Sequence, residues 1–194
     1  MTDFESLYRS DPDPWSVGTA WYERRKRGVL MASLPHEGYG LALELGCGTG
    51  HATRLLAWRC ETVCAVDVSL TAIAECERLL AGDGAANVHL AQLNLPHSWP
   101  RIANESANLV VVSELAYYFS NKNLQIFLSN CLQSLAIGGD WVMCHCKTEF
   151  HDTQQTTEQI HHAMENLAGI ERIVTHDEAC FRLDVWRKYE GIHG

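Results

Sequence analysis

The chain has 194 residues, of which 46% are hydrophobic, and carries a formal net charge of −9 at pH 7. This length is typical of one domain, and the hydrophobic content is sufficient to bury a full core. The negative charge argues against nucleic acid as the main partner, because binding to phosphates requires a basic face.

The sequence carries no signal for secretion or membrane insertion. Residues 1–5 are polar and acidic, unlike the start of a signal peptide, and no apolar run approaches the roughly 18 residues of a membrane helix. There are eight cysteines, and those within predicted strands, Cys64, Cys144 and Cys146, are typical of small buried hydrophobic residues. We therefore expect a cytoplasmic protein in a reducing environment, without membrane contact.

The N-terminal segment differs from the rest of the chain. Its first 16 residues are acidic and contain two prolines, which favour extended neighbours. Ser16 is suited to cap a helix that runs to about Leu34. We expect one domain over residues 1–194, in which an arm and helix at 1–38 precede a core at 39–194.

From residue 41 onward, predicted strands and helices alternate. The predicted strands cover residues 41–45, 62–66, 87–92, 109–112, 140–146, 170–176 and 179–186. The predicted helices cover residues 50–58, 70–80, 121–135 (stopped by Gly138 and Gly139) and 156–167. Continuous apolar runs such as 109–112 are typical of parallel strands covered on both faces, whereas the short link between the last two strands permits only an antiparallel hairpin. The pattern predicts an α/β fold with a mostly parallel sheet that ends in such a hairpin.

The most informative motif is the sequence ELGCGTG at residues 44–50, at the end of the first predicted strand of this sheet. Its three glycines lack a Cβ atom, so the backbone can pass close to a ligand and adopt positive φ. In an open α/β sheet, ligands bind beyond the carboxyl ends of the strands. Asp67 ends the next strand, where a carboxylate can accept hydrogen bonds from both hydroxyls of a ribose. The motif therefore predicts a nucleoside cofactor.

Details of this loop distinguish two kinds of nucleoside cofactor. A dinucleotide-binding loop normally reads G-x-G-x-x-G, but here His51 holds the third glycine position and Gly50 falls one residue early. Glu44 would repel a pyrophosphate and instead suits the amino group or the sulfonium of S-adenosylmethionine. The loop favours this cofactor over a dinucleotide. The alternative to ribose binding by Asp67 is a charge at a helix N-terminus, ahead of Ser69. For His51 the alternative to a role in the site is a surface position at the start of a helix.

Together with Asp67, ELGCGTG resembles motif I of the class I S-adenosylmethionine-dependent methyltransferases, over roughly residues 41–186. The resemblance implies their Rossmann-like, seven-stranded sheet with helices on both faces, and S-adenosylhomocysteine as product. It implies that Asn94 faces the adenine, although many relatives carry Asp there, and that Ser113 lies near the cofactor. The residues expected to bind the cofactor are Glu44, Gly46, Cys47, Gly48, Gly50, Asp67, Val68, Asn94, Leu95 and Ser113.

A narrower resemblance is to the nodulation-protein-S family. It rests on DPW at residues 13–15, WYER at 21–24 and SELAYY at 113–118, and it weakens after about residue 147. Members of that family N-methylate an amino sugar of deacetylated chitooligosaccharides. The resemblance implies a small-molecule acceptor, with an amino sugar as the leading choice.

Methyl transfer requires an aligned nucleophile, and an amine must lose its proton to become one. Glu114, just beyond the predicted strand at 109–112, is the first candidate to orient the amine or take its proton, and Tyr117 is the second. A surface carboxylate and a packing aromatic ring are the alternatives for these two. His145 and His151 are further candidates, and a core histidine is the alternative for His145.

The resembling families also use N-terminal arms as lids over the cofactor, where aromatic rings suit adenine, a sulfonium or a sugar. Core packing is the alternative for the aromatic residues, and the basic run at 24–27 is either a solvated helix face or a substrate contact. The residues expected at the lid or the acceptor are Trp15, Trp21, Tyr22, Arg25, Tyr118 and His151. No metal is expected, because no Cys-x2-Cys spacing occurs.

The sequence therefore predicts an S-adenosylmethionine-dependent methyltransferase for a small acceptor, with N-methylation of an amino sugar as the leading reaction. Three alternatives remain open: a methyltransferase for another small molecule, a module that binds the cofactor without catalysis, and a nicotinamide-dependent oxidoreductase. His51 and Glu44 argue against the oxidoreductase.

Overall fold

The computed structural model describes residues 2–148 and 150–190. The helices are α1 (Phe4–Ser10), α2 (Trp21–Ser33), α3 (Thr53–Ala57), α4 (Leu70–Asp83), the short 3₁₀ helix η1 (Ala116–Tyr118), α5 (Asn121–Ser134) and α6 (Thr157–Glu165). The strands are β1 (Tyr39–Leu45), β2 (Cys60–Asp67), β3 (Val88–Gln92), β4 (Ala107–Ser113), β5 (Leu135–Cys146), β6 (Ile170–Asp177) and β7 (Phe181–Lys188).

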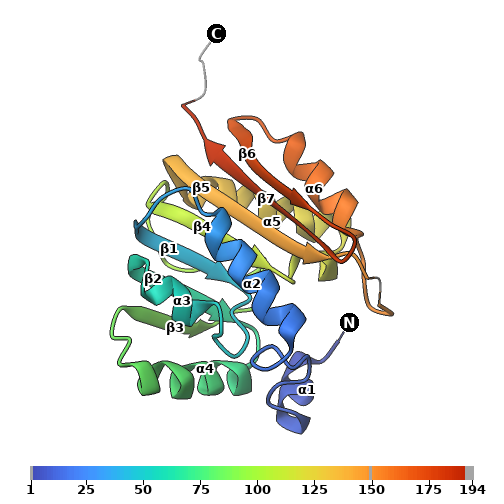
Figure 1. The fold of residues 1–194 in the computed structure, drawn as a ribbon. Helices are drawn as coiled ribbons and strands as arrows, with labels where there is room; N and C mark the ends of the chain where they lie inside the picture. Colours follow the sequence, from blue (N-terminus) through green and yellow to red (C-terminus); the bar gives the residue numbers. More distant parts are fainter. Residues whose placement is uncertain (1, 149, 191–194) are drawn as a thin grey trace.

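The strands form one seven-stranded sheet in the order β3-β2-β1-β4-β5-β7-β6 (Figure 1). Strands β1 to β5 pair in parallel, and β7 runs antiparallel to both β5 and β6. The predicted parallel sheet with a terminal antiparallel hairpin is confirmed. The chain order reverses on the two sides of β1, so the carboxyl ends of β1, β2 and β4 meet at the point where such sheets bind ligands.

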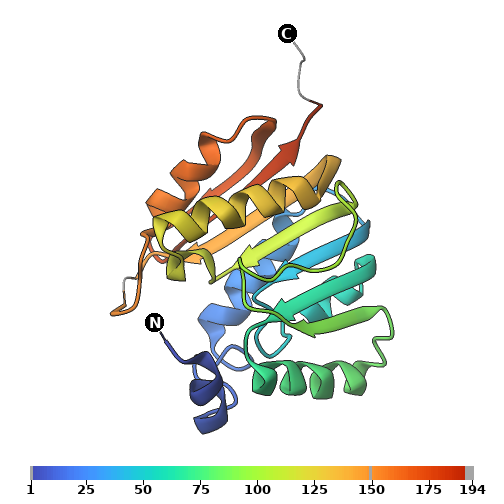
Figure 2. The ribbon, with the colours of Figure 1, turned by 180° about the vertical axis from the view of Figure 1, so that it is seen from behind.

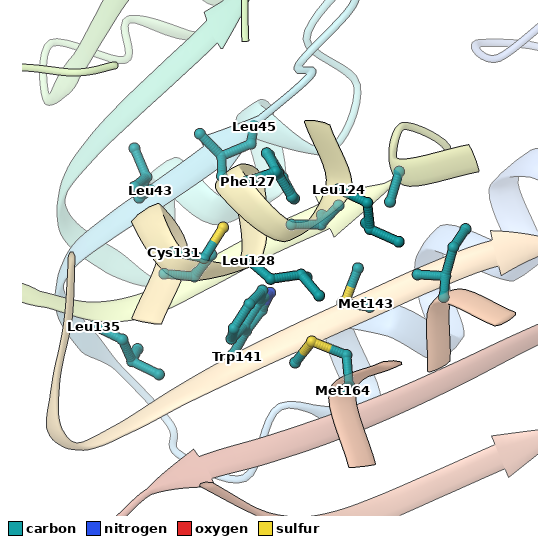
Figure 3. Close-up of a cluster of buried hydrophobic side chains, with 14 of the residues drawn as sticks. Leu43, Leu45, Leu124, Phe127, Leu128, Cys131, Leu135, Trp141, Met143 and Met164 are labelled. Atoms are coloured by element: carbon teal, nitrogen blue, oxygen red, sulfur yellow. The ribbon is translucent and has the colours of Figure 1, made fainter. Parts of the chain in front are cut away.

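Helices cover both faces of the sheet, and each face has its own core (Figures 1 and 2). On one face, Trp141 and Met143 of β5 pack with Phe127 of α5 and Met164 of α6 (Figure 3). On the other face, α2, α3 and α4 contribute a second cluster that includes Leu30. The central strands are buried on both sides, which explains their continuous apolar sequences.

The N-terminal segment differs from its prediction. The arm contains a helix, α1, for which no bounds were predicted, and the next helix begins at Trp21 rather than beside Ser16. Ser16 has a φ of 53°, which differs from the extended backbone typical of a helix N-cap. The carboxylate of Asp13 instead accepts hydrogen bonds from the backbone of Val17 and Gly18, at 2.6 and 3.0 Å. These bonds stabilise a turn in place of the predicted first helical turns.

The start of β5 also differs from its prediction. The strand begins at Leu135, directly after α5, so Gly138 and Gly139 lie within the strand and do not stop the helix. Leu135 pairs with Ala107, and the register then shifts before the next pair. A Cβ atom at Gly139 would lie 2.9 Å from the Ala136 carbonyl oxygen and 3.1 Å from that of Ala107. The two glycines therefore allow an irregularity in the strand, which a sequence pattern interprets as a break.

Two helices differ in length from their predictions. α3 covers only Thr53–Ala57 of the predicted 50–58, whereas α4 extends from its Ser69 cap to Asp83, beyond the predicted 80. In the part of the chain that the structure describes, no helix is long and apolar enough to cross a membrane.

Candidate active site

A cavity of about 1060 Å³ lies at the carboxyl ends of β1, β2 and β4, and α1 and α2 contribute to its wall. The predicted site residues that line it are Trp15, Tyr22, Glu44, Gly46, Cys47, Gly48, Asp67, Val68, Asn94, Leu95, Ser113, Glu114, Tyr117 and Tyr118. The fold thus brings the predicted catalytic pair and every predicted cofactor residue except Gly50 to the wall of one cavity.

The glycine loop forms a tight turn between β1 and α3. The N–H groups of Gly46 and Cys47 both donate to the Val66 carbonyl oxygen at 2.9 Å, and Gly46 and Gly48 have φ values of 83° and 53°. A Cβ atom at Gly48 would lie 3.0 Å from the Tyr8 hydroxyl oxygen. Glycine is therefore required at this turn both for its conformation and for the close approach of α1.

Asp67 connects this loop to the start of α4. One carboxylate oxygen accepts from the N–H of Gly48 at 2.9 Å, and the other accepts from the N–H of Ser69 at 3.0 Å. Burial raises the pKa of Asp67, and these backbone donors oppose that shift. The carboxylate is fixed at the cavity wall and keeps further lone pairs for hydroxyl donors such as those of a ribose.

Glu44 is almost fully buried beneath the loop, with 4% of its surface exposed. Burial raises its pKa to about 8, against a hydrogen bond from Thr53 that lowers it. Among the described residues, no group donates to its buried Oε2 atom. A buried carboxylate without a partner on one oxygen is suited to a cationic ligand. Glu44 therefore fits the amino group and the sulfonium of S-adenosylmethionine.

Four predicted site residues lie outside the cavity lining: Gly50, Trp21, Arg25 and His151. A Cβ atom at Gly50 would lie 2.3 Å from the Cys76 sulfur, so this glycine allows the loop to pack against α4. Trp21 is 71% exposed, His151 is exposed, and Arg25 forms an ion pair with Glu178 at 2.6 Å. We do not include these four in the site.

Glu114 lies directly after β4 in a strained conformation, with a φ of 56°. Its Oε2 atom accepts from the Tyr117 hydroxyl at 2.7 Å and from the Cys146 N–H at 3.2 Å. Its Oε1 atom lies 2.8 Å from Nζ of Lys26. The carboxylate is held at three points against a cavity wall, and this rigidity is what orienting a reactant requires.

Aromatic rings surround this carboxylate. Tyr117 and Tyr118 contact each other edge to face, with ring centroids 4.7 Å apart, and both contact Phe150. Phe4 of α1 packs edge to face on Tyr118 at 4.9 Å and also contacts Trp15. The end of the cavity beside Glu114 therefore combines one fixed carboxylate with apolar ring faces.

His145 lies outside this cavity lining, in the buried core. Its Nε2 atom accepts from the Ala116 N–H at 3.3 Å, and its Nδ1 atom lies 3.2 Å from Nε2 of His161. Nδ1 of His161 in turn lies 2.6 Å from the Asp184 carboxylate. Burial lowers the pKa of His145 well below its usual range, so this imidazole is neutral near pH 7, and both its nitrogen atoms face partners within the core. Of the two interpretations, the core histidine is the one that the structure shows.

Comparisons with known proteins identify the family. The profile described as a methyltransferase domain matches residues 42–139, which is half of the chain. The chain belongs to the methyltransferase-domain family. A structure from Pseudomonas syringae, solved as a candidate methyltransferase, is 30% identical, with a TM-score of 0.76 over 87% of this chain and 100% of that one.

Two further comparisons concern nodulation protein S. The protein of that name from Rhizobium tropici is 29% identical over 67% of this chain and 53% of its own length. The chain spans about half the length of the curated relatives it matches. The N-methyltransferase NodS from Bradyrhizobium japonicum, solved with S-adenosylhomocysteine, has the same fold, with a TM-score of 0.81, 22% identity, and coverage of 96% and 98% of the two chains.

The predicted class of enzyme, a methyltransferase, is confirmed by the match to the methyltransferase-domain family. In this methyltransferase the sequence motifs identified the loop and the residue after β4, but not two cavity residues on the N-terminal helices. Tyr8 of α1 is buried against the glycine loop, and Lys26 of α2 is only 4% exposed. Lys26 follows Tyr22 and precedes Leu30 by four residues each, so it falls on the apolar face of α2. This spacing was the sequence signal that Lys26 is buried. The neighbouring arginines instead indicated a solvated helix face.

Proposed function

We propose that this methyltransferase transfers a methyl group to the amino group of an amino sugar or a deacetylated chitooligosaccharide. The proposal is supported by the likeness to nodulation protein S and to the N-methyltransferase NodS. The observation that carries it is the fixed Glu114 carboxylate among aromatic rings. A carboxylate suits an amine, and aromatic faces suit the apolar faces of sugar rings.

In the proposed complex, Asp67 accepts hydrogen bonds from the ribose hydroxyls and Asn94 faces the adenine. Glu44 attracts the positively charged end of the cofactor, which the glycine loop allows to lie close to the backbone. When bound, S-adenosylmethionine supplies a methyl group on a positively charged sulfur. The acceptor's lone pair would form the new N–C bond, and the sulfur would leave as a neutral thioether.

Glu114 orients the acceptor in this proposal. Its Oε2 atom already accepts two hydrogen bonds, from Tyr117 and Cys146, so the lone pair available to an acceptor is on Oε1. An acceptor N–H that donates there has its lone pair directed away from the carboxylate. Tyr117 holds Glu114 through its hydroxyl, and burial raises the pKa of Tyr117, so this donor keeps its proton.

We further propose that the segment before β1 is part of the same domain and acts as a lid. Glu5 of α1 accepts hydrogen bonds from the Ser69 hydroxyl at 2.7 Å and from the N–H and hydroxyl of Thr71 at 3.1 and 2.9 Å. These contacts join α1 to the start of α4, while Tyr8 and Trp15 line the cavity. A lid of this kind excludes water from the reacting atoms.

The test is methyl transfer from labelled S-adenosylmethionine to a panel of acceptors. Glucosamine and its oligomers are expected to accept the label, whereas the matched N-acetylated oligomers are not, because an amide nitrogen has no available lone pair. If phenols or carboxylates accept the label and glucosamine oligomers do not, the amino-sugar proposal is wrong. Binding of S-adenosylhomocysteine without turnover of any acceptor would instead favour a module without catalysis.

A variant tests the role of Glu114. Glu114→Gln keeps the size of the side chain but removes its charge, and turnover is expected to fall by about 10²-fold while affinity for S-adenosylhomocysteine changes little. Glu105→Gln is the matched control, because Glu105 also has a positive φ, 54°, and lies outside the cavity lining. Equal turnover in the two variants would remove Glu114 from the proposed site.

A further inference from the structure

Lys26 is a buried cation inside the acceptor end of the cavity. Its Nζ atom lies 2.9 Å from Oε1 of Glu23 and 2.8 Å from Oε1 of Glu114, and it lies 4.8 Å from the centroid of the Tyr22 ring. All four residues line the cavity. Within the basic run only Lys26 is fully buried: Arg24 is exposed, Arg25 pairs with Glu178 outside the cavity, and Arg27, which also lines the cavity, is partly buried.

Lys26 keeps its proton around neutral pH. Burial lowers the pKa of Lys26, but Glu114 and Glu23 outweigh that effect and raise it overall. Burial lowers the pKa of Arg27, and the carboxylates of Glu23 and Asp13 both oppose that shift.

Five further titratable groups packed around the cluster are neutral in the same pH range. Burial raises the pKa values of the tyrosines and cysteines and lowers that of the histidine. These groups are Tyr22 of α2, Tyr117 of η1, and Cys144, His145 and Cys146 of β5. The cluster itself therefore consists of two carboxylates and one ammonium.

This arrangement matters for an amine acceptor. Only the neutral form of an amine has a lone pair to attack the methyl group, yet two carboxylates beside it would stabilise the protonated form. The free lone pair on Glu114 is on Oε1, the same atom that Lys26 contacts. An acceptor nitrogen bound there lies next to a second positive charge, which opposes its protonation.

We propose that Lys26 is a positioning residue that holds Glu114 in place and keeps the acceptor's amino group unprotonated. The inference rests on the proposed function, because it requires an amine acceptor. The acceptor releases its ammonium proton to the solvent on binding. Its lone pair then forms the N–C bond, the S–C bond breaks with its electrons remaining on sulfur, and the methylated ammonium product loses a proton to water.

Proton release on binding tests the inference without turnover. Calorimetry would follow a glucosamine oligomer binding to protein saturated with S-adenosylhomocysteine, in two buffers of different ionisation enthalpy, one pH unit below the amine's own pKa. Wild-type protein is expected to release close to one proton per bound amine. Lys26→Met is expected to release close to none, and Lys26→Arg to restore the release. Arg24→Met, on the exposed face of the same helix, is expected to match wild type.

The pH profile of kcat gives a second measurement, because kcat reports ionisations in the bound complex. In Lys26→Met the acidic limb should move upward by about one pH unit, which lowers kcat about tenfold below that limb. Glu23→Gln removes one carboxylate and should move the limb downward, so it tests the inference even if Lys26→Met does not fold.

The outcomes separate the inference from the proposed function. If wild type methylates glucosamine oligomers but the variants at Lys26 and Glu23 keep its proton release and its acidic limb, the inference alone is overturned. A uniform loss of activity at every pH in Lys26→Met, with unchanged proton release, would show a merely structural role and would also overturn it. If wild type methylates no amine, the proposed function fails and the inference fails with it.

Discussion

Replacing Glu44 by Gln is predicted to change the pH dependence of stability. The pKa of Glu44 rises from 4.5 to about 8 in the folded protein, because burial disfavours the ionised carboxylate. One pKa unit corresponds to about 1.4 kcal/mol, so the full change corresponds to about 5 kcal/mol. Since the folded pKa lies above the unfolded one, the stabilisation is present in full below pH 4.5 and is lost as the pH rises through 8.

Glu44→Gln is neutral at every pH and keeps an oxygen atom that can accept from Thr53. Relative to wild type, the free energy of unfolding of the variant should therefore increase by about 3–4 kcal/mol between pH 5 and pH 8. Urea titrations at several pH values measure this difference, with the exposed Glu61→Gln of β2 as control. If Glu44→Gln and wild type differ by the same amount at every pH, the buried carboxylate is not titrating as described and the reasoning fails.

The same substitution predicts an effect on the cofactor. If the positive end of the ligand binds beside Glu44, binding favours the ionised carboxylate, and wild-type affinity for S-adenosylhomocysteine should rise by up to about tenfold per pH unit below 8. Affinity in Glu44→Gln should follow a flatter profile. Calorimetric titrations at pH 6, 7 and 8 distinguish the two, and parallel profiles would separate Glu44 from the ligand.

Three further predictions concern the loop and the lid. Asp67→Asn should weaken binding of S-adenosylhomocysteine by about 1–3 kcal/mol in a calorimetric titration, and unchanged affinity would remove Asp67 from the site. Gly50→Ala should lower the free energy of unfolding by about 2–4 kcal/mol, because its φ is 86° and its Cβ would lie 2.3 Å from the Cys76 sulfur. Gly84→Ala, with a φ of 68° but no described atom within 4 Å of its Cβ, should cost only about 1 kcal/mol, so equal losses would refute the steric argument. Glu5→Gln should speed both proteolysis of the arm and release of S-adenosylhomocysteine. Since the pKa of Glu5 is lowered to about 2, wild type should keep the contact of Glu5 with α4 at every pH above 4.5 and lose it only as the pH falls toward 2.

The sheet could be predicted from the sequence because its signals are local and strong. Buried parallel strands produce continuous apolar runs, and the short link between the last two strands permits only a hairpin. The starts of α2 and β5 were not predictable in the same way. They depend on a side-chain-stabilised turn at Asp13 and on pairing between Ala107 and Leu135, which are separated by 28 positions. Contacts at that separation leave no periodic signal in the sequence.

The site residues also differ in whether the sequence predicts them. Glu44 and Asp67 lie at the carboxyl ends of β1 and β2, and Glu114 directly follows β4, so the topology fixes their positions and sequence motifs identify them. Tyr8 and Lys26 reach the cavity only because α1 and α2 pack across the carboxyl edge of the sheet. Their burial comes from tertiary packing, and a lysine within a basic run is normally solvated.

The two ends of the cavity respond differently to pH, and this separates binding from chemistry. At the cofactor end, Glu44 has a pKa of about 8 and changes charge near neutral pH. At the acceptor end, Lys26 holds its proton and burial keeps Tyr117 neutral. A pH-dependent affinity for the cofactor therefore reports on Glu44. Once the cofactor saturates the protein, the remaining pH dependence of turnover reports on the acceptor's own amino group.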